Sequence, residues 1–447
     1  MAQSMQGELL GDDAPYTQIS SDTRTLMPGD VYIALRGENF DGHDFIAQAI
    51  DKKASCIIAD KQHICETNSG LNIPVIWVKD TTLALGLFAR YWRGQFNIPI
   101  IGITGSCGKT TVKSMLGEIL SLVGETLIPP GSFNNQFGLP FTLLKLNTHH
   151  QYAIIEVGTN HFGEIAYLAN ILKPTISLIT NIGSAHLAAF KTQDNIAKEK
   201  SDLYKFLKPN GTAIINQDEP YAAGWKKDLS LEQTYLSFGL HEGDVTAENI
   251  VVTFEGIAFD LCYQTKKYPL KLQSSGQHSV YNALASACVA LSLHIPMQTI
   301  IKGLENFQSV KGRLRKHQTD SGITIIDDSY NANPASFKAA IDVLATAPGK
   351  KILVMGEMGE LGEKEAQYHQ EMGTFAKKKS IDTLLTFGAL TAHTVHSFGV
   401  GAKEYPDKET LAADLSNILS ALPQNTTVLI KGSRYTGMEE VLNALLN

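Results

Sequence analysis

The chain has 447 residues, 43% of them apolar and 19% charged, which excludes a disordered protein and favours a globular one. Because single hydrophobic cores stop growing at about 250 to 300 residues, this length predicts several domains, and three is the first expectation. The formal net charge is −7 with both signs interspersed, so nucleic acid is not expected as a partner.

The first residues, MAQSMQGELLGDD, lack the basic and apolar runs of a signal peptide, and no segment reaches about 18 uninterrupted apolar residues. Membrane insertion is therefore not expected. The cysteines are odd in number and include no CxxC pair, which favours a reducing compartment. We expect a cytoplasmic protein; its cysteines are Cys56, Cys65, Cys107, Cys262 and Cys288.

Short Ile- and Val-rich runs alternate with helical patterns, which predicts an α/β protein built on largely parallel sheets. In residues 1–85, strands are expected at 30–36, 55–59 and 74–78, with a helix near 44–53. These elements predict a small α/β domain.

Residues 86–312 repeat a strand and helix pattern that is typical of a mononucleotide-binding domain. Its expected strands are 98–104, 152–158, 175–182 and 211–216. Residues 313–447 resemble a doubly wound, Rossmann-like sheet, with ligands expected beyond the carboxyl ends of its strands. The strands expected there are 323–330, 350–358, 383–389 and 426–433, with helices starting at Ser336, Glu363 and Gly437.

A glycine loop follows the strand at 98–104 and precedes a helical pattern, which predicts a phosphate-binding site for ATP. Lys109 is expected to reach the β and γ phosphates, and Thr110 to offer a hydroxyl to Mg²⁺. The loop has the short GxxGKTT form, because Ile103 stands where the standard pattern has glycine. A glycine-rich turn without ligand is the alternative. The candidate residues are Gly105, Ser106, Cys107, Gly108, Lys109, Thr110 and Thr111.

Glu156 ends a predicted strand and is a candidate ligand for the Mg²⁺ that accompanies ATP. A solvated loop carboxylate is an equally plain interpretation of this residue. A GTPase is disfavoured because the sequence contains no NKxD motif.

Several further motifs, in order along the chain, resemble those of the Mur ligases. They are 134–140 (NNQFGLP), 156–158 (EVG), 180–186 (TNIGSAH), 196–200 (IAKEK), 216–218 (NQD), His278 with Asn282, and 312–313 (GR). In the third block, 327–334 (DDSYNANP), 356–362 (GEMGELG) and 431–434 (KGSR) resemble the members that add D-alanyl-D-alanine to UDP-N-acetylmuramoyl-tripeptide. The DNPR motif of the diamino-acid-adding members is absent.

The N-terminal motifs 22–24 (DTR), 28–30 (PGD) and 40–43 (FDGH) resemble the uridine-nucleotide domain of the family. This domain is shared by the last two ligases of the series, so it does not separate them. The candidate residues are Thr23, Arg24, Asp41, Gly42 and His43. The alternative for DGH is an ordinary turn with a surface histidine.

The resemblance implies an ATP-dependent ligase that activates a peptide carboxylate as an acyl phosphate, with Lys109, Glu156, His186 and Lys200 as catalytic residues. One Mg²⁺ would contact Thr110 and Glu156, and a second would lie near His186. Lys200 would carry a carbamate derived from CO₂ that supports the metal site. One alternative is that Lys200 is an unmodified, solvated helix lysine. The other is that the nearby Lys198 is mistaken for the modified residue.

The resemblance also implies that Asn282, Arg313 and Asp328 bind nucleotide. Substrate would contact Asn135, Tyr330, Asn331 and Asn333, although YNANP is also typical of a turn that starts a helix. Closure of the C-terminal domain and a monomeric enzyme are expected.

Two other functions stay open. One is a related ligase, either diamino-acid-adding or similar to folylpolyglutamate synthase; the other is a nucleotide-binding scaffold without catalysis. The sequence does not distinguish lysine from diaminopimelate at the third position of the peptide.

Overall fold

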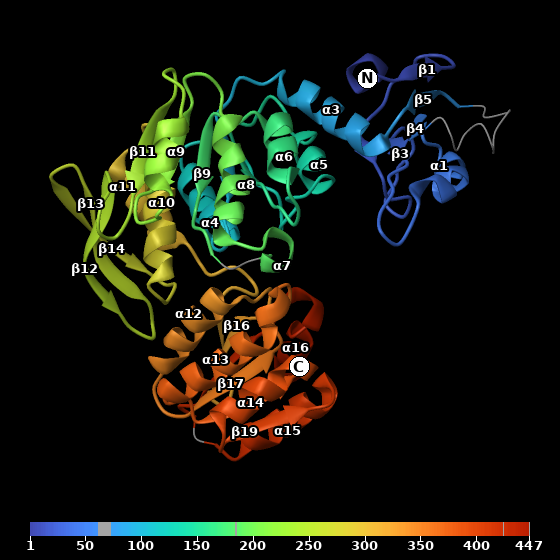
Figure 1. Cartoon of the computed structure of the whole chain (residues 1–447). Helices are drawn as coiled ribbons and strands as arrows, with labels where there is room; N and C mark the ends of the chain where they lie inside the picture. The colour runs from blue at the N-terminus through green and yellow to red at the C-terminus, as the bar shows by residue number, and fades with distance from the viewer. Residues whose placement is uncertain (61–72, 184–185, 423, 447) are drawn as a thin grey trace.

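The computed structural model describes residues 1–60, 73–183, 186–422 and 424–446, which form three α/β domains (Figure 1). Each domain has one sheet, and each sheet mixes parallel with antiparallel pairing. The predicted three-domain α/β architecture is confirmed. Cys65 lies outside the described residues.

The N-terminal domain has a five-stranded sheet of order β1-β5-β4-β3-β2, parallel except where β1 pairs with β5. Strand β4 is buried along its whole length, because its Ile and Ala side chains fill cores on both faces of the sheet. The elements are η1 Ala2–Met5, β1 Glu8–Leu10, β2 Ile19–Ser20, β3 Val31–Ile33, η2 Gly42–Phe45, α1 Ile46–Asp51, β4 Cys56–Asp60 and β5 Val75–Val78.

Helix α3 (Thr81–Arg93) joins the N-terminal and central domains. It begins at Asp80, whose side chain accepts a hydrogen bond from the Leu83 N–H at 2.9 Å, as an N-cap residue does. Leu85 and Phe88 pack into the N-terminal core, whereas Ala89 packs into the central core. One helix is therefore shared by two cores.

Arg93, at the end of α3, is 2% exposed and donates to the carbonyls of Leu172 at 2.8 Å, Lys173 at 3.0 Å and Phe96 at 3.1 Å. Burial lowers the pKa of Arg93 to about 10.

We expect Arg93→Ala to destabilise the protein by about 3 kcal/mol, because it leaves buried carbonyls without a donor. Urea unfolding followed by tryptophan fluorescence measures this. Arg90→Ala, at an exposed position of the same helix, is expected to change stability by less than about 0.5 kcal/mol.

The central domain has a nine-stranded sheet of order β14-β13-β12-β11-β10-β9-β6-β8-β7. Strand β6 lies between β8 and β9 and is parallel to both, so the loops after these strands meet at one edge. The antiparallel strands β12 to β14 were not predicted. The strands of the central sheet are β6 Ile100–Thr104, β7 Thr126–Leu127, β8 Tyr152–Glu156, β9 Ile176–Ile179, β10 Thr212–Asn216, β11 Thr234–Phe238, β12 Val245–Val252, β13 Ile257–Tyr263 and β14 Lys266–Leu272.

Helices cover both faces of this sheet, and α4 with α10 and α11 encloses its largest core. The bounds are α4 Lys109–Leu120, α5 Gly138–Leu143, α6 Glu164–Leu172, α7 Leu187–Phe190, α8 Gln193–Lys205, α9 Ala222–Asp228, α10 His278–Ser292 and α11 Met297–Asn306.

The C-terminal domain has a six-stranded sheet of order β15-β16-β20-β17-β18-β19, in which β15 alone is antiparallel to its neighbour. The elements are β15 Arg315–Gln318, β16 Thr324–Asp328, α12 Pro334–Ala345, β17 Lys351–Gly356, η3 Gly362–Lys364, α13 Glu365–Lys378, β18 Thr383–Phe387, η4 Ala389–Thr391, α14 Ala392–Phe398, β19 Ala402–Tyr405, α15 Lys408–Ser420, β20 Thr427–Lys431, η5 Arg434–Thr436 and α16 Glu439–Leu446.

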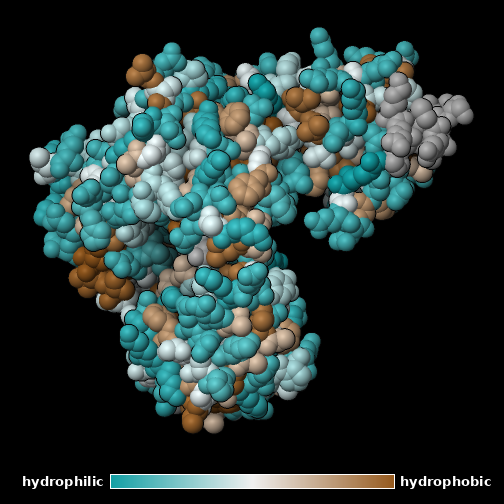
Figure 2. Space-filling view, in the orientation of Figure 1, coloured by the Kyte–Doolittle hydropathy of each residue, from teal (hydrophilic) through white to brown (hydrophobic). Residues whose placement is uncertain are grey.

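The molecule is hollowed between the N-terminal and C-terminal domains on the face shown in Figure 2. Within the described ranges, no helix combines the length and apolar character that crossing a membrane requires.

Candidate active site

A cavity of about 1060 Å³ lies between the central and C-terminal domains. Most of the predicted site residues line it, although they come from segments that are far apart in the sequence. They are Ser106, Cys107, Gly108, Lys109, Thr110, Thr111, Asn135, Glu156, His186, Lys200, Asn282, Arg313, Asp328, Tyr330, Asn331 and Asn333.

The phosphate loop follows β6 and depends on its glycines. Gly105 has φ +148° and Gly108 has φ +85°. A Cβ at these positions would lie 1.9 Å from Thr180 Oγ1 and 2.4 Å from Asn282 Oδ1, respectively. Larger residues are therefore excluded at both positions, which explains the glycine spacing of this short loop.

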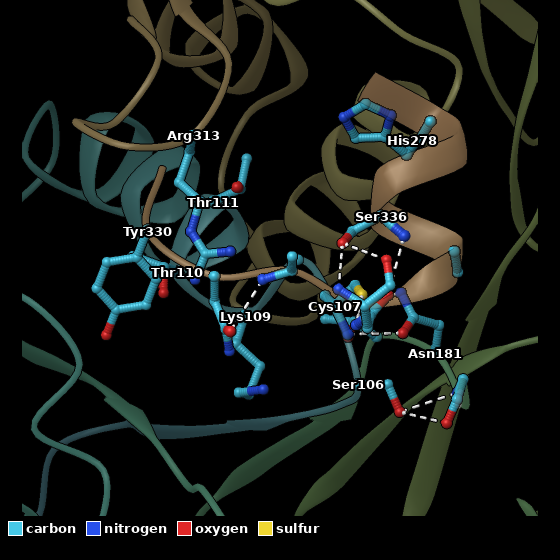
Figure 3. Close-up of a pocket in the computed structure, with 18 of the residues that line it drawn as sticks. Ser106, Cys107, Lys109, Thr110, Thr111, Asn181, His278, Arg313, Tyr330 and Ser336 are labelled. Atoms are coloured by element: carbon cyan, nitrogen blue, oxygen red, sulfur yellow. Dashed lines mark hydrogen bonds between the residues drawn. The ribbon is translucent and has the colours of Figure 1, made fainter. Parts of the chain in front are cut away.

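Hydrogen bonds from the two residues that follow β9 fix the loop backbone. The Cys107 N–H donates to Asn181 Oδ1 at 2.9 Å, and the Thr180 hydroxyl donates to the Cys107 carbonyl at 2.5 Å (Figure 3). The Lys109 ammonium donates to the Gly105 carbonyl at 2.6 Å. Burial lowers the pKa of Lys109 and outweighs the opposing effect of Glu156. The Lys109 side chain thus folds back over the loop in which an ATP phosphate would bind.

Glu156, at the end of β8, is 1% exposed, so it is not a solvated loop carboxylate. Thr110 donates its hydroxyl hydrogen bond to Glu156 Oε2 at 3.3 Å. Lys113 forms an ion pair with Glu156 Oε1 at 2.9 Å and donates to the Gly131 carbonyl at 2.5 Å. No role was predicted for Lys113. Its signal in the sequence is a lysine on a helix face that is otherwise apolar, since Leu116 and other residues on that face of α4 are buried.

Thr110 and Glu156 offer the hydroxyl and carboxylate oxygens that Mg²⁺ prefers. The described residues contain no group of three or more His, Cys, Asp or Glu side chains placed to hold a metal. Mg²⁺ commonly keeps several waters and takes its other ligands from substrate phosphates. This sparse pair of oxygen donors fits a Mg²⁺ that arrives with a nucleotide.

His186, at the start of α7, reaches across to the C-terminal domain. Its Nδ1 lies 2.5 Å from Oε2 of Glu360, and the Ala188 N–H donates to the Glu360 carbonyl at 3.2 Å. The hydrogen bond with His186 lowers the pKa of Glu360. Glu360 lies in the GEMGELG motif at 356–362, and no role was predicted for this residue.

Lys200 lies on the inner face of α8 and is 3% exposed, whereas Lys198 is exposed. Lys200 is therefore not a solvated lysine. Burial lowers its pKa to about 7, and the positive charge of Lys109 adds to the effect. No residue in the described part of the chain forms a hydrogen bond or ion pair with the Lys200 ammonium.

The C-terminal wall of the cavity is built at the carboxyl ends of β16 and β20. There Asp328 and Lys431 form a buried ion pair of 2.6 Å. The Tyr330 ring contacts the guanidinium group of Arg313, which lies 4.3 Å from the ring centroid (Figure 3). The guanidinium group of Arg434 lies 5.6 Å from the same centroid.

Asn333 starts helix α12, as the alternative interpretation of YNANP predicts. Its Oδ1 accepts from the Ser336 N–H at 2.9 Å, completing a capping box, and its Nδ2 donates to Cys107 Sγ at 3.2 Å. Asn331 Oδ1 accepts from the Arg434 N–H at 3.3 Å. The hydrogen bond between Asn333 and Cys107 thus connects the start of α12 to the phosphate loop of the central domain.

The two remaining asparagines belong to the central domain. Asn135 Oδ1 accepts from the Gly138 N–H at 2.9 Å, at the beginning of α5. Asn282 is 5% exposed, and its side chain packs on Gly108 of the phosphate loop.

The five N-terminal candidates and Gly105 are not among the residues that line the cavity. Thr23 donates to Gln48 Oε1 at 2.6 Å, and the exposed Arg24 pairs with Asp22 at 2.8 Å. A Cβ on Gly42 would lie 2.7 Å from the Leu35 backbone. His43 is 8% exposed and 2.5 Å from Asp41, so the alternative of a surface histidine is wrong.

His278 starts α10 at the cavity wall, and burial lowers its pKa to about 4, aided by Lys431. Between pH 6.5 and about 4 the unfolded chain therefore binds more protons at this residue than the folded one, so stability falls as pH falls. We expect His278→Gln to lose less stability than the wild type across this window. Thermal midpoints at each end of the window measure the difference, and equal losses would contradict it.

Three family models match the chain: "Mur ligase family, catalytic domain" over residues 15–93, "Mur ligase middle domain" over 103–290 and "Mur ligase, glutamate ligase domain" over 312–434. The UDP-N-acetylmuramoyl-tripeptide–D-alanyl-D-alanine ligase of Escherichia coli (strain K12) is 38% identical, covering 99% of this chain and 96% of its own length.

Solved structures show the same family relationship as the sequence comparisons. A crystal structure of MurF from Acinetobacter baumannii is 37% identical with a TM-score of 0.92, covering 99% of this chain and 97% of that one. MurF ligase from Thermotoga maritima in complex with ADP is 28% identical with a TM-score of 0.84, covering 96% of each chain. The resemblance predicted from the motifs is confirmed: the chain belongs to the Mur ligase family, and within it to the UDP-N-acetylmuramoyl-tripeptide–D-alanyl-D-alanine ligases.

Proposed function

We propose that this chain is an ATP-dependent ligase that joins D-alanyl-D-alanine to UDP-N-acetylmuramoyl-tripeptide in peptidoglycan synthesis. The observation that carries the proposal is the full-length similarity to ligases of that name. The site supports it, because one cavity holds a phosphate loop on one wall and the YNAN and KGSR segments on the other.

In this reaction the γ-phosphoryl group of ATP moves to the peptide carboxylate, and the amine of the dipeptide then displaces phosphate from the acyl phosphate. Both steps bring anions together, so catalysis depends on positioning and on stabilising negative charge. Lys109 and the loop N–H groups hold the phosphates, and Arg313 adds positive charge from the opposite wall. Thr110 and Glu156 would hold one Mg²⁺ and His186 would lie near a second, and these ions would neutralise further negative charge.

Lys200 is the proposed site of carbamylation. Its side chain is buried without a partner, and burial lowers its pKa to about 7, which favours the neutral amine. A neutral amine adds to CO₂ through its nitrogen lone pair and releases one proton to solvent. The carbamate replaces a cation by an anion beside Lys109. This change removes the repulsion between two lysines and provides a carboxylate that supports the metal.

In this proposal, each domain binds a different part of the set of substrates. Residues 1–85 bind the uridine nucleotide through Thr23, Arg24 and the segment 41–43. Residues 86–312 bind ATP with Asn282, and place Asn135 beside the peptide. Residues 313–447 close over the nucleotide with Arg313 and Asp328, and orient the dipeptide with Tyr330, Asn331 and Asn333. We propose a cytoplasmic monomer.

The proposal is tested by phosphate release from ATP and Mg²⁺ with UDP-N-acetylmuramoyl-tripeptide, run with and without D-alanyl-D-alanine. We expect release to require the dipeptide and mass spectrometry to find the UDP-pentapeptide. Turnover with a free diamino acid or glutamate instead would assign the chain to a related ligase. ATP binding without any amine-dependent turnover would favour a scaffold.

A further inference from the structure

His186 of the central domain and Glu360 of the C-terminal domain are in contact across the domain boundary, at 2.5 Å between Nδ1 and Oε2. Both residues adopt left-handed backbone conformations, with φ +56° and +63°. Such conformations are unfavourable in non-glycine residues and persist where the surroundings enforce them, often at functional sites. The hydrogen bond from the Ala188 N–H to the Glu360 carbonyl holds the two segments together.

Two other histidines show what a structural histidine looks like in this chain. In His369, Nδ1 lies 2.8 Å from the Glu365 carbonyl and Nε2 accepts from the Met358 N–H at 3.0 Å. In His43, Nδ1 contacts Asp41 and Nε2 accepts from the Asp60 N–H at 3.2 Å. Both nitrogens of each ring are used inside the protein.

His186 differs, because only one of its ring nitrogens is used. Nδ1 contacts Glu360, and no described residue forms a hydrogen bond with Nε2, while the residue lines the cavity. A carboxylate at Nδ1 holds the proton on that nitrogen and leaves a lone pair on Nε2, which is how carboxylates orient histidines that bind metals.

We propose that Glu360 is a positioning residue that orients the His186 imidazole, so that Nε2 is delivered to a divalent cation only when the C-terminal domain is docked. The inference rests on the proposed function, which places Mg²⁺ near His186. It goes further by making one ligand of the central domain depend on a carboxylate of another domain. Domain docking and metal binding are then one coupled event.

The test measures Mg²⁺-dependent binding of β,γ-methylene-ATP by isothermal titration calorimetry, with neither the UDP-precursor nor the dipeptide present. We expect Glu360→Ala to weaken the apparent Mg²⁺ affinity by about 10- to 100-fold, as loss of such a supporting carboxylate does. Glu360→Gln is expected to lose less, because its amide oxygen still accepts from Nδ1–H. Glu363→Gln, on the exposed start of η3, is the matched control and should equal the wild type.

A double-mutant cycle separates an effect through His186 from an independent one. In the His186→Ala background, Glu360→Ala should cause no further loss. Additive losses would mean that Glu360 binds the cation itself and would overturn the proposal. Tighter Mg²⁺ binding by Glu360→Ala would overturn it as well, because Glu360 would then compete with the cation.

Small-angle X-ray scattering with the same nucleotide excludes a purely mechanical role. We expect Glu360→Gln and the wild type to have equal radii of gyration, whereas an expanded variant would show that Glu360 only holds the domains together. If the wild type makes no UDP-pentapeptide, the proposed function fails. The present inference fails only through the Mg²⁺ measurements and the scattering.

Discussion

Replacement of Lys109 by alanine is expected to lower turnover by about 100- to 1000-fold, because it removes a charged donor from the transferring phosphoryl group. Steady-state phosphate release with saturating ATP measures this loss. In the free protein the same ammonium donates to the Gly105 carbonyl at 2.6 Å, so binding ATP exchanges one hydrogen bond for another. ADP affinity should therefore change much less than turnover.

Lys198→Ala serves as the control, since that lysine is exposed on α8 and outside the cavity. It should keep wild-type turnover and thermal stability. A Lys109→Ala enzyme that retains a tenth or more of wild-type turnover would contradict the placement of the ATP phosphates in this loop.

Replacement of Lys200 by methionine is expected to lower turnover by about 100-fold while raising the melting temperature by about 3 to 5 °C in CO₂-free buffer. The stability gain arises because the folded state must bury an unpaired amine whose pKa is lowered to about 7. Between about pH 7 and 10.5 the unfolded chain binds more protons than the folded one, so the wild type gains stability as pH rises. The advantage of the methionine variant should be full below pH 7 and disappear towards pH 10.5.

The carbamate itself is tested separately. ¹³C-labelled bicarbonate should give a carbamate signal in the wild type that is absent from Lys200→Met. Lys200→Ala should lose activity without unfolding, and a small added carboxylate should restore part of the rate. An unchanged rate in Lys200→Ala would show that the amine has no role in the chemistry.

The buried parallel strands were the most predictable part of the fold. Strands such as β8 and β17 are continuous apolar runs, because both faces of their sheets are covered by helices. Strands β13 and β14 were not predicted because buried and exposed side chains alternate along them. In β13, Ile257, Phe259 and Leu261 are buried and the residues between them are half-exposed. A period of two within a seven-residue segment gives a weaker signal than an uninterrupted run.

Within the site, residues on the phosphate loop could be predicted because a local backbone shape dictates their types. Gly105 and Gly108 are required by positive φ and by close neighbours. Lys113 and Glu360 could not be placed in the same way, because their partners are distant in sequence. Glu156 lies 43 positions beyond Lys113 and belongs to strand β8, whereas Lys113 lies on helix α4; His186 belongs to a different domain from Glu360. Sequence motifs carry the residue types but not these pairings.

Helix α3 has a practical consequence for dissecting the protein. Its Leu85 and Phe88 belong to the N-terminal core, whereas Ala89 and the neighbouring Trp92 pack with the central one. A fragment that begins after β5 would keep the helix but expose its apolar face to water, and such a patch promotes aggregation. A fragment that begins after α3 would uncover the central core instead. The first two domains are therefore best expressed, crystallised and evolved as a single unit, and a cut near residue 312 offers the cleaner division.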